Sequence, residues 1–236
     1  MEDLCSKFNI SMNTARRDIG ELVTSGIVKK VYGGVTVCSR PPVQLNEGSV
    51  KNREVKIRIA ERAAEYVCDG DIIYIDSGTT TAHMIKYLKD KTITIITNNL
   101  NIIVAAVPFN NIDIIAIGGN FSRKTNAFNG FNNSLILKDF NINKAFLSTI
   151  GISIENGLTN EIPLEYQIKK AVVEKSSNIF ILADNTKFNV SSMLTFCELQ
   201  KVDCLITDKE PPSNFVEHFQ QIGVNVSVAP LCGNNT

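Results

Sequence analysis

The sequence contains no tryptophan, only two histidines and only seven prolines among its 236 residues. It also lacks net charge, because 24 Lys and Arg residues balance 24 Asp and Glu residues. A neutral chain excludes a uniformly basic nucleic-acid coat and an acidic disordered protein, so any contact with nucleic acid must come from a local patch. No apolar run reaches the ~18 residues of a membrane span, and the first ten residues do not have the pattern of a signal peptide. We therefore expect a cytoplasmic protein without a membrane partner.

Metal, disulfide and nucleotide chemistry have little support in the sequence. The six cysteines include no Cys-x-x-Cys pair, which argues against a zinc finger and favours small buried thiols. His83 and His218 have no companions at metal-ligand spacing, so we predict no metal site. We expect His83 at a pocket rim or in solvent, and His218 on the surface of a C-terminal amphipathic helix. The Walker motif lacks its lysine and the Gly-x-Gly-x-x-Gly motif is absent, so no cofactor is expected.

Charge and composition divide the chain into two parts. Residues 1–58 contain ten Lys or Arg and six Asp or Glu, a net charge of +4 in a chain that is neutral overall. The segment RPPVQLNEG (40–48) carries Pro and Gly and has little apolar periodicity, as linkers do. We therefore predict a small basic domain over residues 1–39, a linker over 40–48 and a large domain over 49–236.

The small domain has the pattern of two short helices and a β-hairpin. Apolar residues share one face of residues 2–8, and Ser11 is a good N-cap for a second helix, whose apolar positions recur every three or four residues. The segment IVKKVYGGVTV (27–37) predicts a basic hairpin. Arg16 and Arg17 lie off the apolar stripe, where a recognition helix presents side chains to bases and phosphates. An isolated Arg-Arg-Asp triplet is also typical of a solvated helix face.

The segment SMNTARRDIGELVTSGIVKKVYGGV (11–35) resembles the winged helix-turn-helix of DeoR-type bacterial transcriptional regulators, with ARRDI (15–19) at the place of that family's Arg-Arg-Asp signature. The resemblance implies binding to operator DNA by a homo-oligomer, a dimer or higher, because operator half-sites are paired. The family's module begins with a further helix. We therefore expect that the module is truncated at its start and that the apolar faces of its two helices lack a cover. The residues assigned to DNA binding are Ser11, Asn13, Thr14, Arg16, Arg17, Lys29, Lys30 and Tyr32.

Beyond the linker, short apolar runs alternate with helical stretches. The runs are nearly continuous in Ile, Val and Leu, which is typical of strands buried on both faces of a parallel sheet. A helix is predicted before the first run, through Ile59, Ala60, Ala63 and Val67. Alternating strands and helices predict a doubly wound, mostly parallel α/β domain. We predict its strands at 71–75, 93–97, 113–118, 144–150, 178–183, 204–207 and 225–229.

The turn DSGTT (76–80) follows the first of these strands and opens a predicted helix. In open α/β sheets, ligands bind beyond the carboxyl ends of the strands, where free backbone N–H groups at helix N-termini suit phosphate. The same residues are also compatible with an ordinary capped turn. Polar or glycine residues end three further strands, at 98–99, 118–119 and 184–187, which predicts that these residues meet at one edge of the sheet.

Segments 59–81, 97–99, 117–119, 157–171 and 181–188 resemble the effector domain of the same DeoR regulators, which is similar to sugar-phosphate isomerases such as ribose-5-phosphate isomerase. The resemblance implies a phosphorylated sugar or related metabolite as effector. Matching positions assign the phosphate to Asp76, Ser77, Gly78, Thr79 and Thr80, and the rest of the pocket to Asn98, Gly119, Glu165, Lys169, Asp184 and Lys187.

These residues leave alternatives open. Glu165 and Lys169 lie one helical turn apart, a spacing more typical of a surface ion pair, and Lys170 competes with Lys169 for a place in the site. In a sugar-phosphate isomerase, Glu165 or Asp76 would be the base and Lys169 or Lys187 the donor to the carbonyl oxygen. An isomerase has no use for a basic hairpin and a linker. The sequence therefore favours a DNA-binding transcriptional regulator, which we interpret as a repressor of sugar-metabolism genes, over an enzyme.

Overall fold

The computed structural model describes residues 2–24, 28–31, 34–37 and 52–230. The chain divides into two compact units, residues 1–47 and 48–236, and we treat each unit separately. None of the helices within the described ranges combines the length and the apolar character that are needed to cross a bilayer.

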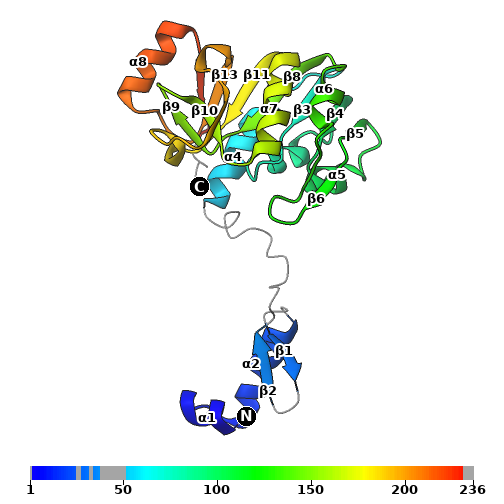
Figure 1. Cartoon of the computed structure of the whole chain (residues 1–236), viewed down its shortest axis with the longest axis vertical. Coiled ribbons are helices and arrows are strands. Elements are labelled where there is room, and N and C mark those ends of the chain that lie inside the picture. The colour runs from blue at the N-terminus through cyan, green and yellow to red at the C-terminus, as the bar shows by residue number, and fades with distance from the viewer. Residues whose placement is uncertain (1, 25–27, 32–33, 38–51, 231–236) are drawn as a thin grey trace, which may run out of the picture. The chain divides into compact units, whose positions relative to one another are not determined.

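The smaller unit contains the two helices and the hairpin that the sequence predicts (Figure 1). The backbone N–H of Thr14 donates to Ser11 Oγ at 3.1 Å, so Ser11 is the N-cap of the second helix. The sequence predicts that Gly26 caps the C-terminal end of this helix, but Gly26 and Tyr32 lie outside the described residues. The elements are α1 (Glu2–Phe8), α2 (Met12–Thr24) and the antiparallel strands β1 (Val28–Val31) and β2 (Gly34–Val37).

Apolar side chains of the smaller unit are unevenly covered. Ala15 on α2 is buried, whereas Phe8 is 62% exposed and Leu22 is 40% exposed. Large apolar side chains are usually buried when a unit has an adequate core. The described residues of the smaller unit therefore form little apolar core.

A seven-stranded parallel sheet forms the centre of the larger unit, in the order β14-β13-β11-β8-β3-β4-β5. Each strand overlaps one of the seven predicted runs, which confirms the predicted α/β fold class. The strands are β3 (Ile72–Ile75), β4 (Ile93–Thr97), β5 (Ile112–Ala116), β8 (Ile142–Ser148), β11 (Ser176–Leu182), β13 (Cys204–Thr207) and β14 (Asn225–Val228).

Helices cover both faces of this sheet, so each face has its own apolar core (Figure 1). On one face the core includes side chains from α4 (Arg53–Ala64), the 3-10 helix η1 (Thr81–Tyr87) and α5 (Leu100–Ala106). On the other face it includes side chains from α6 (Asn133–Leu137), α7 (Pro163–Lys175) and α8 (Ser213–Ile222). Burial on both faces explains why the strand sequences are apolar throughout.

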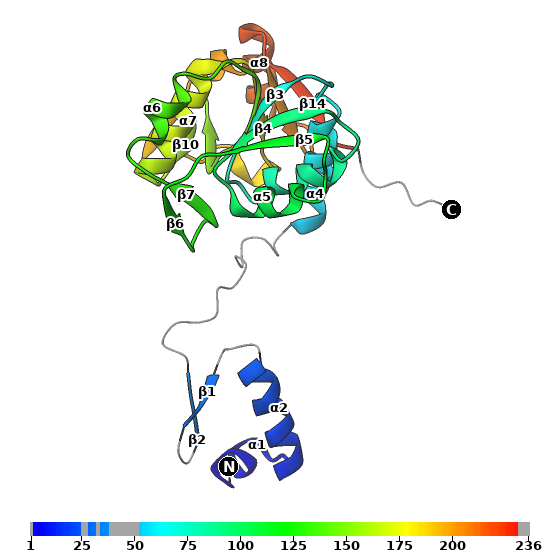
Figure 2. The same ribbon diagram turned by 90° about the vertical axis from the view of Figure 1, so that its right-hand side faces the viewer.

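Two smaller sheets lie outside the parallel sheet. Strands β6 (Asn120–Ser122) and β7 (Ala127–Asn129) form an antiparallel hairpin in the segment 120–130, which the sequence left unassigned (Figure 2). Strands β9 (Gly151–Ser153), β10 (Gly157–Asn160) and β12 (Leu194–Cys197) form a three-stranded antiparallel sheet. The remaining 3-10 helices are η2 (Asn185–Lys187) and η3 (Leu199–Lys201).

The helix that the sequence predicts after the DSGTT turn is a 3-10 helix. Three consecutive threonines precede and enter it, and β-branched side chains disfavour the α-helix. The Thr81 hydroxyl donates to the backbone carbonyl oxygens of Asp76 at 2.8 Å and Gly78 at 2.9 Å, which ties the helix start to the end of β3.

The strand order places a topological switch point between β3 and β8. From β3 the chain proceeds outward through β4 and β5, and the later strands β8, β11, β13 and β14 fill the other half of the sheet. At such a point the loops that follow two neighbouring strands leave in opposite directions and open a crevice for a ligand. The carboxyl ends of β3 and β8 flank this switch point.

Candidate functional site

A buried ion pair occupies the switch point. Lys169 Nζ on α7 donates to Asp76 Oδ2 at the end of β3, and both side chains are only 3% exposed. Ser148, at the end of β8, donates to the same carboxylate oxygen through its backbone N–H at 3.0 Å and its hydroxyl at 2.5 Å. Lys169 Nζ also donates to the Ser148 carbonyl oxygen at 2.7 Å. The three groups therefore hold two strand ends and a helix together.

This arrangement keeps Asp76 ionised. Burial opposes the charge, but the Lys169 ammonium group and the hydrogen bonds from Lys169 and Ser148 outweigh it and lower the pKa of Asp76. Gly78 allows the close approach, because a Cβ atom there would lie 2.2 Å from Ser148 Oγ. An ionised carboxylate bound to a buried ammonium group is a fixed part of the site.

Glu165 is buried beside this pair but does not pair with Lys169, contrary to the spacing argument. Asn160 Nδ2 donates to Glu165 Oε2 at 3.3 Å, while Oε1 has no hydrogen bond among the described residues. Burial raises the pKa of Glu165; Lys169 opposes the rise and Asp76 adds to it. Lys170, the competing lysine, is exposed, with its ammonium group over the Tyr166 ring, so Lys169 is the lysine of the site.

The turn after β3 offers unpaired backbone donors. The backbone N–H groups of residues 77–80 donate no hydrogen bond to any residue that the structure describes. Thr80 is buried, and Ser77, Gly78 and Thr79 are half-buried. Consecutive N–H groups of this kind form a concave anion-binding surface. No side-chain hydrogen bond caps the helix that follows, so the donors of this turn are available to an anion.

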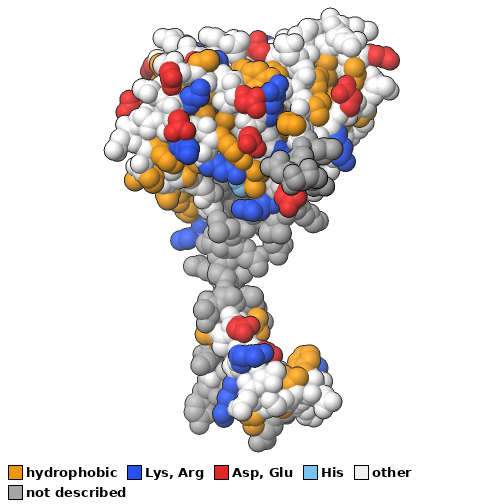
Figure 3. Space-filling model, turned by 180° about the vertical axis from the view of Figure 1, so that it is seen from behind, with side chains coloured by type: hydrophobic (Ala, Val, Ile, Leu, Met, Phe, Trp, Pro, Cys, Tyr) orange, Lys and Arg blue, Asp and Glu red, His pale blue; other side chains and the backbone are white. Residues whose placement is uncertain are grey.

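Lys56 is a candidate that the sequence analysis missed. It lies near the start of α4 and is only 8% exposed. Burial lowers the pKa of Lys56, nearby Asp184 opposes this, and Lys187 lowers it further. Lys56 also contributes to the lowered pKa of His83 on η1, after burial, Lys86 and Arg53. Positive charge therefore converges beside η1, and Figure 3 shows Lys and Arg side chains next to a histidine on the larger unit.

Asp184 and Lys187 follow β11 at the same edge. Asp184 Oδ1 accepts a hydrogen bond from the backbone N–H of Thr186 at 3.0 Å and another from the Thr186 hydroxyl, so Asp184 caps η2. The backbone N–H of Asn185 donates to Asp208 Oδ1 at 2.7 Å, which fixes the other side of this short helix. Lys187 is half-buried at the end of η2. Asp184 therefore positions the segment that carries Lys187.

The β6–β7 hairpin packs against the end of β4. Asn98, at the end of β4, accepts a hydrogen bond from the Tyr74 hydroxyl at 3.2 Å and donates to the Phe128 carbonyl oxygen at 3.0 Å. Gly119 has φ +138°, and a Cβ atom there would lie 2.7 Å from the Asn129 carbonyl oxygen. Asn98 and Gly119 thus hold the hairpin in place, and Gly119 itself is exposed.

The structure brings the eleven predicted effector residues to one edge of the sheet and adds three that the sequence analysis missed. Ser148 was hidden inside the predicted strand 144–150. Lys56 had a readable signal, because it extends the apolar stripe of Ile59, Ala60 and Ala63 by one turn, where a charged side chain becomes buried. Thr125, in the turn between β6 and β7, gave no signal in the sequence.

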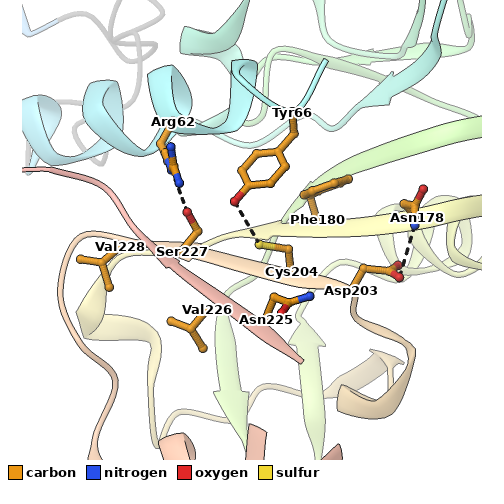
Figure 4. Close-up of a pocket in the computed structure, with 10 residues that line it drawn as sticks. All are labelled: Arg62, Tyr66, Asn178, Phe180, Asp203, Cys204, Asn225, Val226, Ser227 and Val228. Atoms are coloured by element: carbon orange, nitrogen blue, oxygen red, sulfur yellow. Dashed lines mark hydrogen bonds between the residues drawn. The ribbon is translucent and has the colours of Figure 1, made fainter. Parts of the chain in front are cut away.

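A separate cavity of about 540 Å³ lies toward the amino ends of β11 and β13, beside the edge strand β14 (Figure 4). Its charged groups already have partners: Arg62 Nε donates to Ser227 Oγ at 2.8 Å, and the backbone N–H of Ile179 donates to Asp203 Oδ2 at 2.7 Å. None of the predicted effector residues lines it. The carboxyl edge therefore remains the candidate effector site.

The described histidines and cysteines differ in how far they are buried. His83 and His218 are both half-buried, and no group of His, Cys, Asp and Glu side chains within the described ranges is arranged to hold a metal ion. Burial raises the pKa of Cys197 to about 12, so its thiol stays protonated. Cys204 is also buried, but Cys68 is exposed, so the expectation of buried thiols is wrong for Cys68.

In the smaller unit, the predicted DNA-binding residues have different environments. Asn13, Arg16 and Arg17 are exposed on α2, and Arg17 makes only a long contact of 3.9 Å with Asp18. The hydroxyl groups of Ser11 and Thr14 lie 2.8 Å apart in the N-cap. The side chains of Lys29 and Lys30, and all of Tyr32, lie outside the described residues.

Comparison with known proteins identifies related chains over both units. "HTH-type transcriptional regulator IolR" of Bacillus subtilis is 39% identical over 231 residues, which cover 96% of this chain and 92% of that protein. "Putative aga operon transcriptional repressor" of Escherichia coli O157:H7 is 27% identical and covers 96% of this chain and 86% of its own. The structure of ribose 5-phosphate isomerase A from Methanocaldococcus jannaschii is 18% identical, covers 58% of this chain and 55% of that chain, and has a TM-score of 0.43.

Family descriptions match both units. "DeoR-like helix-turn-helix domain" matches residues 1–41, and "DeoR C terminal sensor domain" matches residues 51–209. The named relatives are regulators, which favours the regulator over the isomerase. Since these matches cover most of the sequence, the chain belongs to the DeoR family of HTH-type transcriptional regulators.

Proposed function

We propose that the larger unit binds a phosphorylated sugar or related metabolite at the carboxyl edge of the sheet, and that binding changes the affinity of the smaller unit for operator DNA. The turn at residues 77–80 is the observation that carries the proposal. Its backbone N–H groups have no partner among the described residues, and it lies at the same sheet edge as Lys187 and Lys56. Unpaired N–H donors and ammonium groups are the groups that bind a phosphate dianion.

Each assigned residue then has a physical role. The phosphate is held by residues 77–80 together with Lys187 and Lys56, and Asp184 positions Lys187 through its cap of η2. Asp76 fixes Lys169 at the switch point between β3 and β8. Asn98, Glu165 and Lys169 offer hydrogen bonds to the remainder of the ligand, and Gly119 allows the hairpin to approach them.

The effector test measures thermal shifts of the full chain with inorganic phosphate and a panel of pentose and hexose phosphates. We expect phosphorylated sugars to raise the unfolding midpoint, because ligands that bind only the folded state stabilise it. Lys187→Met should weaken their affinity about tenfold, since it removes one charge-assisted hydrogen bond. Lys89→Met, at an exposed lysine beyond η1, is the matched control. If no phosphorylated sugar stabilises the wild-type chain, the proposal is wrong.

For DNA, we propose that the exposed groups Asn13, Arg16 and Arg17 on α2, with the Lys29–Lys30 strand and Tyr32 as a wing, contact an operator. Ser11 and Thr14 set the start of that helix. Because each chain carries one recognition helix, a dimer is the smallest assembly that reads two half-sites. We also propose that the chain acts as a repressor when it binds this operator.

The DNA test compares wild type with Arg17→Ala in titrations at several salt concentrations. Loss of one phosphate contact should weaken binding and reduce the slope of log K against log salt by about one. Arg123→Ala removes an exposed arginine of the larger unit and should leave the slope unchanged. Binding that does not depend on salt in the wild-type chain would exclude this mode of recognition.

A further inference from the structure

One side of the larger unit exposes a concentration of large apolar side chains. Among the described residues of this unit ten such side chains are exposed, and six of them lie in residues 104–115 and 131–136. These segments contain α5, the edge strand β5 and α6; in Figure 2, β5 lies in front, with α5 below it and α6 to its left. We call these six side chains the β5 surface: Val104, Val107, Ile115, Phe131, Leu135 and Ile136.

The area of the β5 surface is close to that of one half of a protein interface. Its side chains are 37–78% exposed, and together they present about 600 Å² of apolar area, given that a whole aromatic side chain offers ~150–250 Å². The largest apolar patch of a typical monomer is ~300–600 Å², and each partner of a stable complex buries ~800 Å². A partner that covers the β5 surface therefore gains most of the area that a stable dimer requires.

The cover of the sheet stops before β5 on the side of α6. Side chains alternate along a strand, and Ile112 and Ile114 pack in the core beside α5, so Ile115 points to the opposite face. Ile96, the residue beside Ile115 on β4, is fully buried in the core of that face, whereas Ile115 is 37% exposed. The apolar face of the sheet thus continues beyond its own helices.

The backbone of β5 also has a free edge, because β5 ends the sheet. The N–H group of Ile117 donates to the Thr97 carbonyl oxygen at 2.8 Å, so the odd-numbered residues of this segment form hydrogen bonds with β4. The N–H and C=O groups of Ile114 and Ala116 therefore point away from the sheet. β5 contains none of the lysines, prolines or bulges that protect the edges of sheets.

An antiparallel copy of β5 fits this edge with twofold symmetry. With the axis at Ile114, the two Ile114 residues exchange both of their hydrogen bonds, and the C=O group of Ile112 accepts from the N–H group of Ala116 in the other strand. The N–H group of Ile112 already donates to the Phe109 carbonyl oxygen at 3.2 Å, so it needs no partner. The strand is therefore complementary to itself, as an isologous interface requires.

Charge favours a copy of this chain over a polyanionic partner. Asp113 on β5 and Lys138 at the C-terminal end of α6 are exposed, and neither makes an ion pair within the described ranges. One charge of each sign gives no attraction for nucleic acid or an anionic membrane, which bind clusters of Lys and Arg. Each contact occurs twice in a twofold dimer, so Asp113 of each copy is available to Lys138 of the other.

We propose that the β5 surface is the interface of a homodimer, in which the β5 strands of two copies pair antiparallel about a twofold axis at Ile114. The choice of a second copy as the partner rests on the proposed function, because an operator with two half-sites requires two recognition helices. This dimer joins the two parallel sheets into one continuous sheet and protects both β5 edges.

The test compares Ile115→Asp and Phe131→Asp, within the β5 surface, with two matched controls outside it. Val228→Asp changes an exposed valine of β14, the strand at the opposite edge of the sheet, and Met193→Asp changes an exposed residue before β12. Sedimentation equilibrium of the full chain over a wide concentration range measures the dissociation constant of the dimer. Circular dichroism checks that each variant is folded.

We expect wild type to form dimers. Ile115→Asp and Phe131→Asp should each raise the dissociation constant about tenfold or more, because each places a carboxylate without a partner in the interface. The two controls should change the constant less than about twofold, because they lie outside the contact. Phe131 is 78% exposed, so Phe131→Asp keeps the test valid if Ile115→Asp does not fold. A monomeric wild type, or a folded Phe131→Asp that dimerises as wild type does, overturns the interface.

Amide hydrogen exchange tests the strand pairing itself. The N–H groups of Ile114 and Ala116 should exchange about tenfold or more slowly in wild type than in Phe131→Asp, because only the dimer protects them. Equal exchange overturns the pairing of the β5 strands. Titration with operator DNA separates this inference from the proposed function: a monomer that binds an operator refutes the interface alone, whereas a dimer that binds none supports the interface and refutes the proposed function.

Discussion

Asp76 and Lys169 show how one buried ion pair can organise a site. Each side chain is 3% exposed, so both lose their hydration on folding, and the loss is offset by their contact and by the hydrogen bonds from Ser148. Removal of one partner from such a pair typically costs about 3–5 kcal/mol, because the other charge stays buried. The pair is therefore poorly suited to move with each ligand. Groups with spare hydrogen-bonding capacity, such as Glu165, are better placed to change their contacts when a ligand binds.

The raised pKa of Glu165 predicts that the free energy of unfolding depends on pH. Its folded-state pKa is raised above the ordinary value of 4.5, so its contribution to stability is fully present below that value and is lost as pH rises through the folded-state pKa. A glutamine side chain at this position does not ionise. The free energy of unfolding of Glu165→Gln minus that of wild type should therefore increase with pH above 4.5, as measured by urea denaturation from pH 4 to pH 8.

The pKa of Asp76 is lowered, so its contribution to stability is lost as pH falls through its folded-state pKa. Because Asp76 is present in both proteins, this contribution cancels in the difference between their free energies of unfolding. A difference that stays constant over the whole pH range would show that the Glu165 carboxyl group is not perturbed by burial.

At the scale of the elements, the ends of β3 and β8 lie so close together that position 78 has room only for glycine. A Cβ atom at Gly78 would lie 2.2 Å from Ser148 Oγ and 2.5 Å from Ser148 Cβ. Gly78→Ala should therefore push Ser148 away from Asp76 and destabilise the chain by about 1–3 kcal/mol, the usual cost of overpacking. It should also weaken binding of phosphorylated sugars.

Gly118→Ala is the matched control, because no heavy atom lies within 4 Å of a Cβ placed there and the backbone conformation is an ordinary one. Thermal unfolding with and without a sugar phosphate compares the two variants. Equal stability of Gly78→Ala and Gly118→Ala would mean that the close approach of the two strand ends is not required.

At the scale of the whole molecule, the two units differ in how much core they have. Both apolar clusters of buried residues lie within residues 59–229, whereas the smaller unit leaves Phe8 and Leu22 substantially exposed. A unit of ~40 residues has little buried surface to stabilise it. The larger unit should therefore carry most of the thermal stability of the chain.

We predict two unfolding transitions for the full chain in calorimetry, the weaker from the smaller unit. A sugar phosphate at about 100 times its Kd should stabilise the larger unit by about 2.7 kcal/mol and move mainly the upper transition. Operator DNA should move mainly the lower one. A single transition that responds equally to both ligands would show that the units unfold together.

The sequence supported accurate predictions where local pattern is decisive. Continuous Ile and Val runs located all seven strands of the parallel sheet, and polar residues at their ends located Asp76, Asn98 and Asp184 at one edge. The sequence also predicts the turn at 76–80 and the helix after it, but not that this helix is a 3-10 helix, because the effect of Thr81 on the backbone depends on contacts with Asp76 and Gly78.

The chain by itself thus determined its strands, its basic N-terminal helix and hairpin, and its membership of a family of regulators. Only the tertiary structure decided that β8 lies beside β3, and with it that Ser148 meets Asp76, that Lys169 pairs with Asp76, and that Lys56 lies near Asp184 and Lys187. The reason is physical: periodicity reports which face of an element is buried, whereas strand order and the partners of buried charges depend on contacts between segments far apart in the chain.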